Sequence, residues 1–111
     1  MQAAPSTQDY LPEKLTAQAA AQLPGAVVLD FGTNWCGYCQ AARAPVDAAL
    51  AGFPSIRHIR VEDGKGRPLG RAFGVKLWPT LVLLRDGKEA ARLVRPDRQA
   101  EIEQLLHAQV P

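Results

Sequence analysis

Apolar positions divide the chain into segments with the periods of helices and strands. Near the start they recur every four residues, at Leu11, Leu15, Ala19 and Leu23. This period predicts a helix over residues 12–23. The segment that follows it, over residues 26–31, is rich in β-branched and aromatic side chains and too apolar to alternate. It is therefore predicted to be a strand that is buried on both faces.

The rest of the chain continues this alternation. A second helix is predicted over residues 36–51, and Pro45 is expected to kink it. A final helix is predicted over residues 97–109, with Asp97 as its N-cap. The shorter predicted elements are a short helix over residues 69–73 and strands over residues 56–61, 80–84 and 89–94.

The order of these elements predicts a mixed sheet. A βαβ unit comes first, and a hairpin with a tight turn at Asp86-Gly87 and a last helix follow it. Since crossover strands pair in parallel and hairpin strands pair antiparallel, the fold class is α/β, with a four-stranded mixed central sheet and helices on both faces. We expect residues 11–111 to form this single domain and residues 1–10 to form a flexible N-terminal segment.

Composition and charge narrow the classes of function. The 111 residues suffice for one domain with its own core. Thirteen Lys and Arg residues oppose eleven Asp and Glu residues, and both signs are scattered, so no broad field favours nucleic-acid binding. The longest apolar run, residues 81–84, is far below the roughly 20 residues that span a bilayer. We therefore expect neither nucleic-acid binding nor membrane insertion.

The first residues bear on the compartment. Residues 1–7 are small and polar and lack the basic and apolar regions of a signal peptide. This favours a cytoplasmic protein, and a periplasmic protein whose export signal had been removed would begin in the same way. We expect the chain to be a monomer.

The two cysteines, Cys36 and Cys39, carry the strongest chemical signal. They enclose too short a loop for a stabilising disulfide and are too few for an all-cysteine zinc site within one chain. At a helix start, unpaired backbone N–H groups and the helix dipole would stabilise a Cys36 thiolate. Cys39, one turn further in, would be placed to resolve a mixed disulfide. Half of a shared metal site, or two ordinary buried cysteines, are the alternatives.

Five motifs resemble those of the thioredoxin family, in the same order, between residues 26 and 109. They are Leu29-Asp30-Phe31, Trp35-Cys36-Gly37-Tyr38-Cys39, Phe73-Gly74-Val75, Trp78-Pro79-Thr80-Leu81 and Asp86-Gly87-Lys88. The resemblance implies a thioredoxin fold and a protein thiol-disulfide oxidoreductase. It also implies protein disulfide substrates and a separate reductase or membrane electron donor. Because the two sulfurs would carry the electrons, no metal or organic cofactor is expected.

The resemblance implies roles for residues around the cysteines. Pro79 would be cis and face the CxxC motif, and the backbone next to it would pair with the substrate chain. Trp78 is as compatible with a core position as with contact to a partner. The expected substrate-binding residues are Trp35, Gly37, Tyr38, Trp78, Pro79 and Thr80.

Asp30 is a carboxylate in an otherwise apolar strand. Burial of an unpaired carboxylate is unfavourable, and buried acids are candidates for proton transfer. By the resemblance, Asp30 would help to deprotonate Cys39; a solvent-facing or turn-capping aspartate is the alternative. His58, in the next predicted strand, is a candidate proton partner of Asp30, although a half-exposed strand residue is the plainer interpretation.

Two residues depart from the family pattern near the predicted site. Tyr38 stands between the cysteines, where thioredoxins proper carry proline. Arg95 replaces a glycine that normally lets the substrate backbone approach, which indicates different or electrostatically chosen partners, unless its long side chain simply turns outward. Beside the cytoplasmic oxidoreductase, a periplasmic thiol-disulfide interchange protein and a non-catalytic CxxC binding module remain open.

Overall fold

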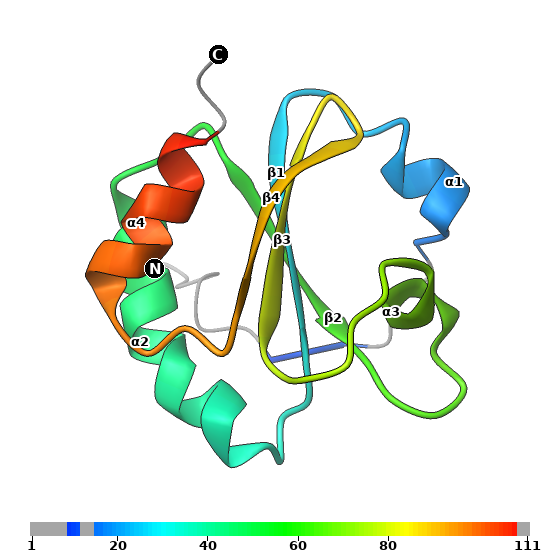
Figure 1. The fold of residues 1–111 in the computed structure, drawn as a ribbon, viewed down its shortest axis with the longest axis horizontal. Helices are drawn as coiled ribbons and strands as arrows, with labels where there is room; N and C mark the ends of the chain where they lie inside the picture. The colour runs from blue at the N-terminus through cyan, green and yellow to red at the C-terminus, as the bar shows by residue number, and fades with distance from the viewer. Residues whose placement is uncertain (1–8, 12–14, 109–111) are drawn as a thin grey trace, which may run out of the picture.

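The computed structural model describes residues 9–11 and 15–108, and it confirms a mixed four-stranded sheet. Its elements are α1 (Ala17–Ala20), β1 (Ala26–Gly32), α2 (Gly37–Ala51), β2 (Arg57–Glu62), α3 (Pro68–Ala72), β3 (Thr80–Arg85), β4 (Lys88–Val94) and α4 (Gln99–His107). The strand order is β2-β1-β3-β4. Helices α2 and α4 cover one face of the sheet, and α1 and α3 cover the other (Figure 1).

Strand β1 lies inside the sheet because its side chains are apolar on both faces. It pairs in parallel with β2, where Leu29 is opposite Ile59, and antiparallel with β3, where Leu29 is opposite Val82. Residues 27–32 are all buried, as the lack of alternation in this segment predicts. The carboxyl end of β1 is thereby fixed beneath the start of α2, which follows it in the chain.

Two apolar clusters hold the helices to the sheet, one on each face. Full burial of one large aliphatic side chain contributes about 1.5–3 kcal/mol. The cluster under α2 and α4 comprises Val28, Ala42, Val46, Ala49, Ile56, Leu81, Leu83, Ile102, Leu105 and Leu106. The cluster on the opposite face comprises Ala20, Val27, Leu29, Phe31, Ile59, Val61, Leu69, Val82 and Leu84.

The hairpin between β3 and β4 turns where the sequence predicts it. Asp86 and Gly87 have φ angles of 51° and 83°, and two successive positive values are the signature of a type I′ turn. A side chain at Gly87 would collide with the Ala21 carbonyl, so this turn packs against the end of α1. The Asp86 carboxylate accepts a hydrogen bond from the Gly25 backbone N–H at 2.9 Å.

Helix α1 is shorter than the helix predicted over residues 12–23. It begins after Thr16, whose Oγ1 accepts a hydrogen bond from the Ala19 N–H at 3.0 Å and so caps the helix. Residues 12–14 lie outside the described part of the chain. Among the described helices, none has the length and apolar character required to cross a membrane.

Helix α4 begins two residues later than predicted, and Asp97 is not its N-cap. Arg98 occupies that position. The reason is that Glu101 folds back: its Oε1 accepts hydrogen bonds from the backbone N–H of Asp97 at 2.7 Å and of Arg98 at 3.4 Å. These bonds satisfy two backbone donors at the helix start that have no carbonyl partner within the helix.

Tyr10 belongs to the domain and not to the N-terminal segment that was expected over residues 1–10. Its side chain is only 3% exposed. Its backbone N–H donates to Asn34 Oδ1 at 2.8 Å, and Asn34 Nδ2 donates to the Tyr10 carbonyl at 3.0 Å. The next residue, Leu11, forms an isolated parallel bridge with Val61. Residues 1–8 lie outside the described part of the chain.

The packing of α4 generates a stability prediction. Ile102 is fully buried between α4 and the sheet, so Ile102→Ala should lower the free energy of unfolding by about 2–5 kcal/mol. Gln104→Ala, on the exposed side of the same helix, should change it by no more than about 0.5 kcal/mol. Urea denaturation followed by circular dichroism measures both. A loss below about 1 kcal/mol for Ile102→Ala would contradict this packing.

Candidate active site

The two cysteines lie at the start of α2, just after β1 ends. Cys36 is the N-cap of the helix, and Cys39 lies in its first turn. The backbone N–H of Cys39 donates a hydrogen bond to the Cys36 Sγ at 3.4 Å. Both are free thiols, 8% and 2% exposed respectively. The structure therefore places Cys36 nearer the surface than Cys39. The backbone N–H that points at the Cys36 sulfur forms a stronger hydrogen bond when its acceptor is ionised, as in a thiolate.

Cys39 lies in surroundings that favour its protonated form. Burial is the largest cause, and it raises the pKa of the Cys39 thiol from 9.0 to about 12. A backbone hydrogen bond with Thr33 opposes the shift, while Cys36 and the Asp30 carboxylate add to it. At neutral pH the proton therefore stays on Cys39, and the thiolate forms only if a base accepts that proton.

Asp30 is buried in the middle of the sheet, which excludes the solvent-facing alternative. Its Oδ1 accepts a hydrogen bond from the Tyr10 hydroxyl at 2.6 Å. His58 Nε2 lies 2.9 Å from Oδ2, and Arg60 Nε forms an ion pair with the same oxygen at 3.4 Å. A buried carboxylate is tolerated when it is paired and hydrogen-bonded, and these three side chains supply both conditions.

Strand β2 explains why two of these partners meet Asp30. In the parallel register with β1, Arg60 is directly opposite Asp30. His58 lies two residues before Arg60 in β2. Residues two apart in a strand point to the same face, so both side chains reach the carboxylate. Arg60 also forms an ion pair with Asp47 of α2 at 3.0 Å. Apolar and polar residues alternate along β2, and this pattern was the signal that could have identified Arg60 as a further residue of the site.

Tyr10 and Gly32 are two further residues of the site that the sequence analysis did not identify. A Cβ atom at Gly32 would lie 2.6 Å from Cys39 Sγ and 2.8 Å from Tyr10 Cζ. A glycine at the end of β1 is therefore needed for the tyrosine ring and the buried sulfur to pack there. The only signal for Tyr10 was a single aromatic residue in an otherwise small and polar N-terminal segment.

The Trp78–Pro79 peptide bond is cis, as the resemblance implied. Pro79 and Thr80 are buried, and the Thr80 hydroxyl donates to the Leu77 carbonyl at 2.6 Å. Trp78 is half-buried and packs against the cluster formed by the two cysteines and Tyr10. Its indole Nε1 donates to Asp63 Oδ2 at 2.8 Å. The indole is therefore held beside the sulfurs by both packing and a hydrogen bond.

The remaining predicted substrate-binding residues lie at the exposed mouth of the site. Trp35 and Tyr38 are 75% and 59% exposed, and Gly37 is exposed between them in the chain. The Trp35 ring meets the Trp78 ring edge to face, with 5.6 Å between centroids. Exposed aromatic rings of this size are unusual on a small soluble domain and mark surfaces that contact partners.

Arg95 does not simply turn outward. Its guanidinium lies over the Tyr38 ring, 4.0 Å from the centroid, and its Nε donates to the Trp78 carbonyl at 3.0 Å. The Arg95 backbone has a φ angle of 51°, and its N–H donates to the Pro79 carbonyl at 2.8 Å. A residue that departs from the family pattern thus joins the CxxC motif to the segment around the cis proline.

The arrangement contains the elements of dithiol-disulfide chemistry. One sulfur lies nearer the surface, a second is more deeply buried one helical turn away, and a paired carboxylate acts on the second. Within residues 9–11 and 15–108, no group of three or more His, Cys, Asp and Glu side chains is placed to hold a metal ion. The chemistry that these residues can perform by themselves is transfer of two electrons between the thiols and a disulfide.

Comparisons with known proteins agree with this chemistry. The sequence model of the thioredoxin family matches residues 13–108. Thioredoxin of Chlamydia muridarum is 38% identical over 71 residues, which cover 63% of this chain and 69% of that protein. The reduced form of thioredoxin 2 from Pseudomonas aeruginosa PAO1 superposes with a TM-score of 0.84 at 43% identity, over 94% of this chain and 96% of that one. With its fold, dithiol and buried carboxylate in place, the chain belongs to the thioredoxin family of thiol-disulfide oxidoreductases.

Proposed function

We propose that Cys36 is the nucleophile and Cys39 the resolving thiol in exchange with protein disulfides. The observation that carries this assignment is the different setting of the two sulfurs. Cys36 Sγ accepts a backbone N–H at the exposed mouth of the site, whereas Cys39 is buried and burial raises its pKa to about 12. Only Cys36 is therefore placed to attack a partner as a thiolate.

The exchange proceeds in two displacement steps. The Cys36 thiolate attacks one sulfur of the substrate disulfide, forms a mixed disulfide and releases the other substrate sulfur as a thiolate. Cys39 then loses its proton and attacks the Cys36 sulfur, which releases the second substrate thiol. Two electrons pass from the protein to the substrate, and the protein is left with a Cys36–Cys39 disulfide.

Asp30 is the base that we assign to the second step. Its carboxylate is close enough to Cys39 to raise the pKa of that thiol, and Tyr10 and Arg60 hold it in position. The His58 side chain is 14% exposed, and its Nε2 lies 2.9 Å from Asp30 Oδ2. His58 thus offers the proton a path from the buried carboxylate to water.

The segment around Pro79 is the surface on which the substrate chain would lie. Trp78, which precedes Pro79, packs against the two cysteines, while Trp35 and Tyr38 are exposed beside them in the chain. A Cβ at Gly37 would meet no atom within 4 Å, so open space remains beside Cys36. We infer that the partners are proteins with disulfides and a separate reductase or membrane electron donor, and that the chain acts as a monomer.

The division of roles generates a trapping prediction. Without a resolving thiol, Cys39→Ser should accumulate a covalent mixed disulfide with a disulfide protein such as insulin, because nothing displaces the partner from Cys36. Non-reducing electrophoresis and mass spectrometry would detect the adduct. Cys36→Ser, the matched control, should form none, since Cys39 is buried and protonated. Absence of an adduct with Cys39→Ser would instead support a CxxC binding module without turnover.

The role of Asp30 generates a second prediction. Asp30→Asn keeps the shape of the side chain but removes the base, so release of the partner should slow by about 100-fold or more while attack by Cys36 is little changed. Single-turnover quench experiments with a peptide disulfide separate the two steps. The deficit should shrink as pH rises toward 12, because hydroxide then deprotonates Cys39 without Asp30.

Asp47→Asn is the matched control for this experiment. Asp47 also pairs with Arg60, at 3.0 Å, but it does not bond to Asp30 in the described structure. Its substitution should leave the release rate near that of the wild type. Equal slowing by both substitutions, or a deficit that is the same at every pH, would show that Asp30 acts only on the structure.

A further inference from the structure

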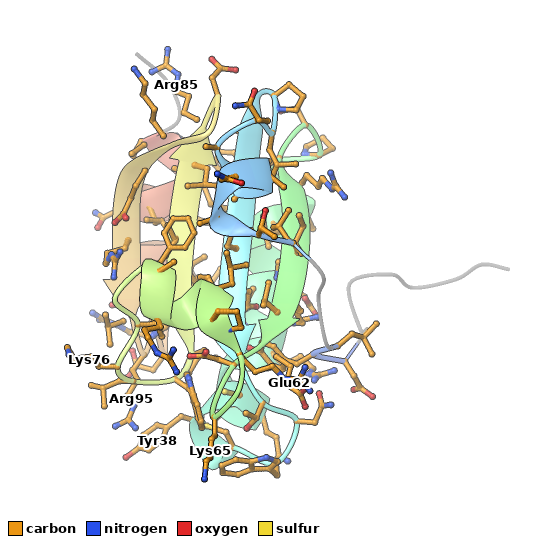
Figure 2. All side chains as sticks on the ribbon, turned by 90° about the vertical axis from the view of Figure 1, so that its right-hand side faces the viewer. Tyr38, Glu62, Lys65, Lys76, Arg85 and Arg95 are labelled. Carbon is orange, nitrogen blue, oxygen red and sulfur yellow. The ribbon has the colours of Figure 1, made fainter. Side chains whose placement is uncertain are left out.

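Four cations lie near Trp78 and Tyr38, two residues of the candidate active site. They are Lys65, Arg71, Lys76 and Arg95, and we call them the basic rim. All four are exposed, and none forms a salt bridge with a carboxylate of the described residues. Figure 2 shows Lys65, Lys76 and Arg95 at the same end of the molecule as Tyr38, with Arg85 at the opposite end. The near-neutral charge of the whole chain therefore conceals a local positive excess.

Two carboxylates lie near the rim, and they reduce this excess without cancelling it. Glu62 is balanced by Arg67 at 2.7 Å, whereas Asp63, which accepts the neutral indole N–H of Trp78, keeps its negative charge. Arg71 and Lys76 line a hollow of about 220 Å³ that Asp63, Arg67 and Trp78 also line, so cations outnumber the one carboxylate there. Lys65 follows Gly64, which lies against the Trp78 ring. Beside Trp78, positive side chains thus face space that a partner could fill.

Arg95 provides the other side of the basic rim and is held in place before a partner arrives. Its guanidinium stacks on Tyr38, and its Nε is bonded to the Trp78 carbonyl. Its Nη groups carry further N–H donors of the kind that match a carboxylate in pairs. An arginine whose position is already fixed loses less conformational entropy when it binds.

We propose that the basic rim binds acidic residues that flank the disulfide of a protein substrate. This inference rests on the proposed function and adds to it the chemical class of the partner. Cations near Trp78 and at Tyr38 would meet Asp or Glu side chains that lie next to the reacting cysteine of the partner. Complementary charge of this kind mainly raises the rate of association and is weakened by salt.

Three peptides with one intramolecular disulfide test the proposal. They differ only in the residues next to the cysteines, which are Glu, Gln or Lys. In each reaction the protein dithiol is oxidised to a disulfide and the peptide disulfide is reduced to two thiols. Rates are followed by chromatography after acid quench, at about 0.01 M salt, where the screening length is about 30 Å, and at about 1 M, where it is about 3 Å.

At low salt the Glu peptide should be reduced about tenfold faster than the Lys peptide, with the Gln peptide between them. The ratio of the Glu-peptide rate to the Lys-peptide rate should approach one at high salt. Replacing two cations of the basic rim, Arg95→Gln with Lys76→Gln, should reduce the low-salt ratio severalfold. Lys76→Gln alone should reduce it in part, and this variant avoids the contacts of Arg95 with Tyr38 and Trp78.

The matched control removes two positive charges from the hairpin at the other end of the molecule. Arg85→Gln with Lys88→Gln should leave the ratio of the Glu-peptide rate to the Lys-peptide rate unchanged. Lys88 is paired with Arg85 across β3 and β4, and Arg85 lies at the opposite end of the molecule from Tyr38 (Figure 2). Equal rates for the Glu and Lys peptides at low salt would overturn the proposed preference while leaving the exchange reaction intact. Reduction of none of the three peptides would overturn the exchange reaction itself and the preference with it.

Discussion

The carboxylate of Asp30 is buried in an apolar sheet, and much of the surrounding structure satisfies it. Tyr10 donates to one oxygen, while His58 and Arg60 meet the other from the neighbouring strand. Removing one partner of a buried charged group typically destabilises a protein by several kcal/mol, so these contacts constrain the fold as well as the chemistry. They fix the register of β1 against β2 and draw the chain before α1 into the core. They also require a glycine at position 32, where a side chain would displace the tyrosine and the buried sulfur.

The same arrangement gives the two thiols different roles. Cys39 lies between the carboxylate below and Cys36 above, in surroundings that keep its proton in place until a base removes it. Cys36 lies where the helix begins, with a backbone N–H directed at its sulfur and aromatic side chains around it. Fold, helix start and buried acid act together in the proposed exchange. The fold leaves Cys36 nearer the surface, the helix start directs an N–H at its sulfur, and the buried acid would accept the proton of Cys39. Arg95 joins this mouth through contacts with Tyr38 and the cis-proline segment, and it contributes to the charge that a partner meets.

Features set by local sequence were predictable, and features set by long-range contacts were not. The buried strand β1, the Asp86-Gly87 turn and the position of the CxxC motif at a strand-to-helix junction all follow from patterns within a few residues. Tyr10 could not be placed, because its hydrogen bond to Asp30 spans 20 residues and no periodic pattern marks it. The stacking of Arg95 on Tyr38 could not be predicted for the same reason, because it depends on how the end of β4 lies against the start of α2. Helix ends were missed where a side chain satisfied a backbone donor differently from the usual cap, as at α4.

The buried site holds the proton on Cys39 at neutral pH, and the proposed division of roles between the two thiols depends on it. A titration of the reduced protein with ¹³C-labelled cysteine, observed by NMR at the Cys39 Cβ, tests it most directly because the signal does not depend on access of a reagent. With the pKa raised to about 12, the Cys39 signal should not move as pH passes through the ordinary thiol value of 9.0, and it should shift only at much higher pH. A midpoint at or below 9.0 would contradict the account.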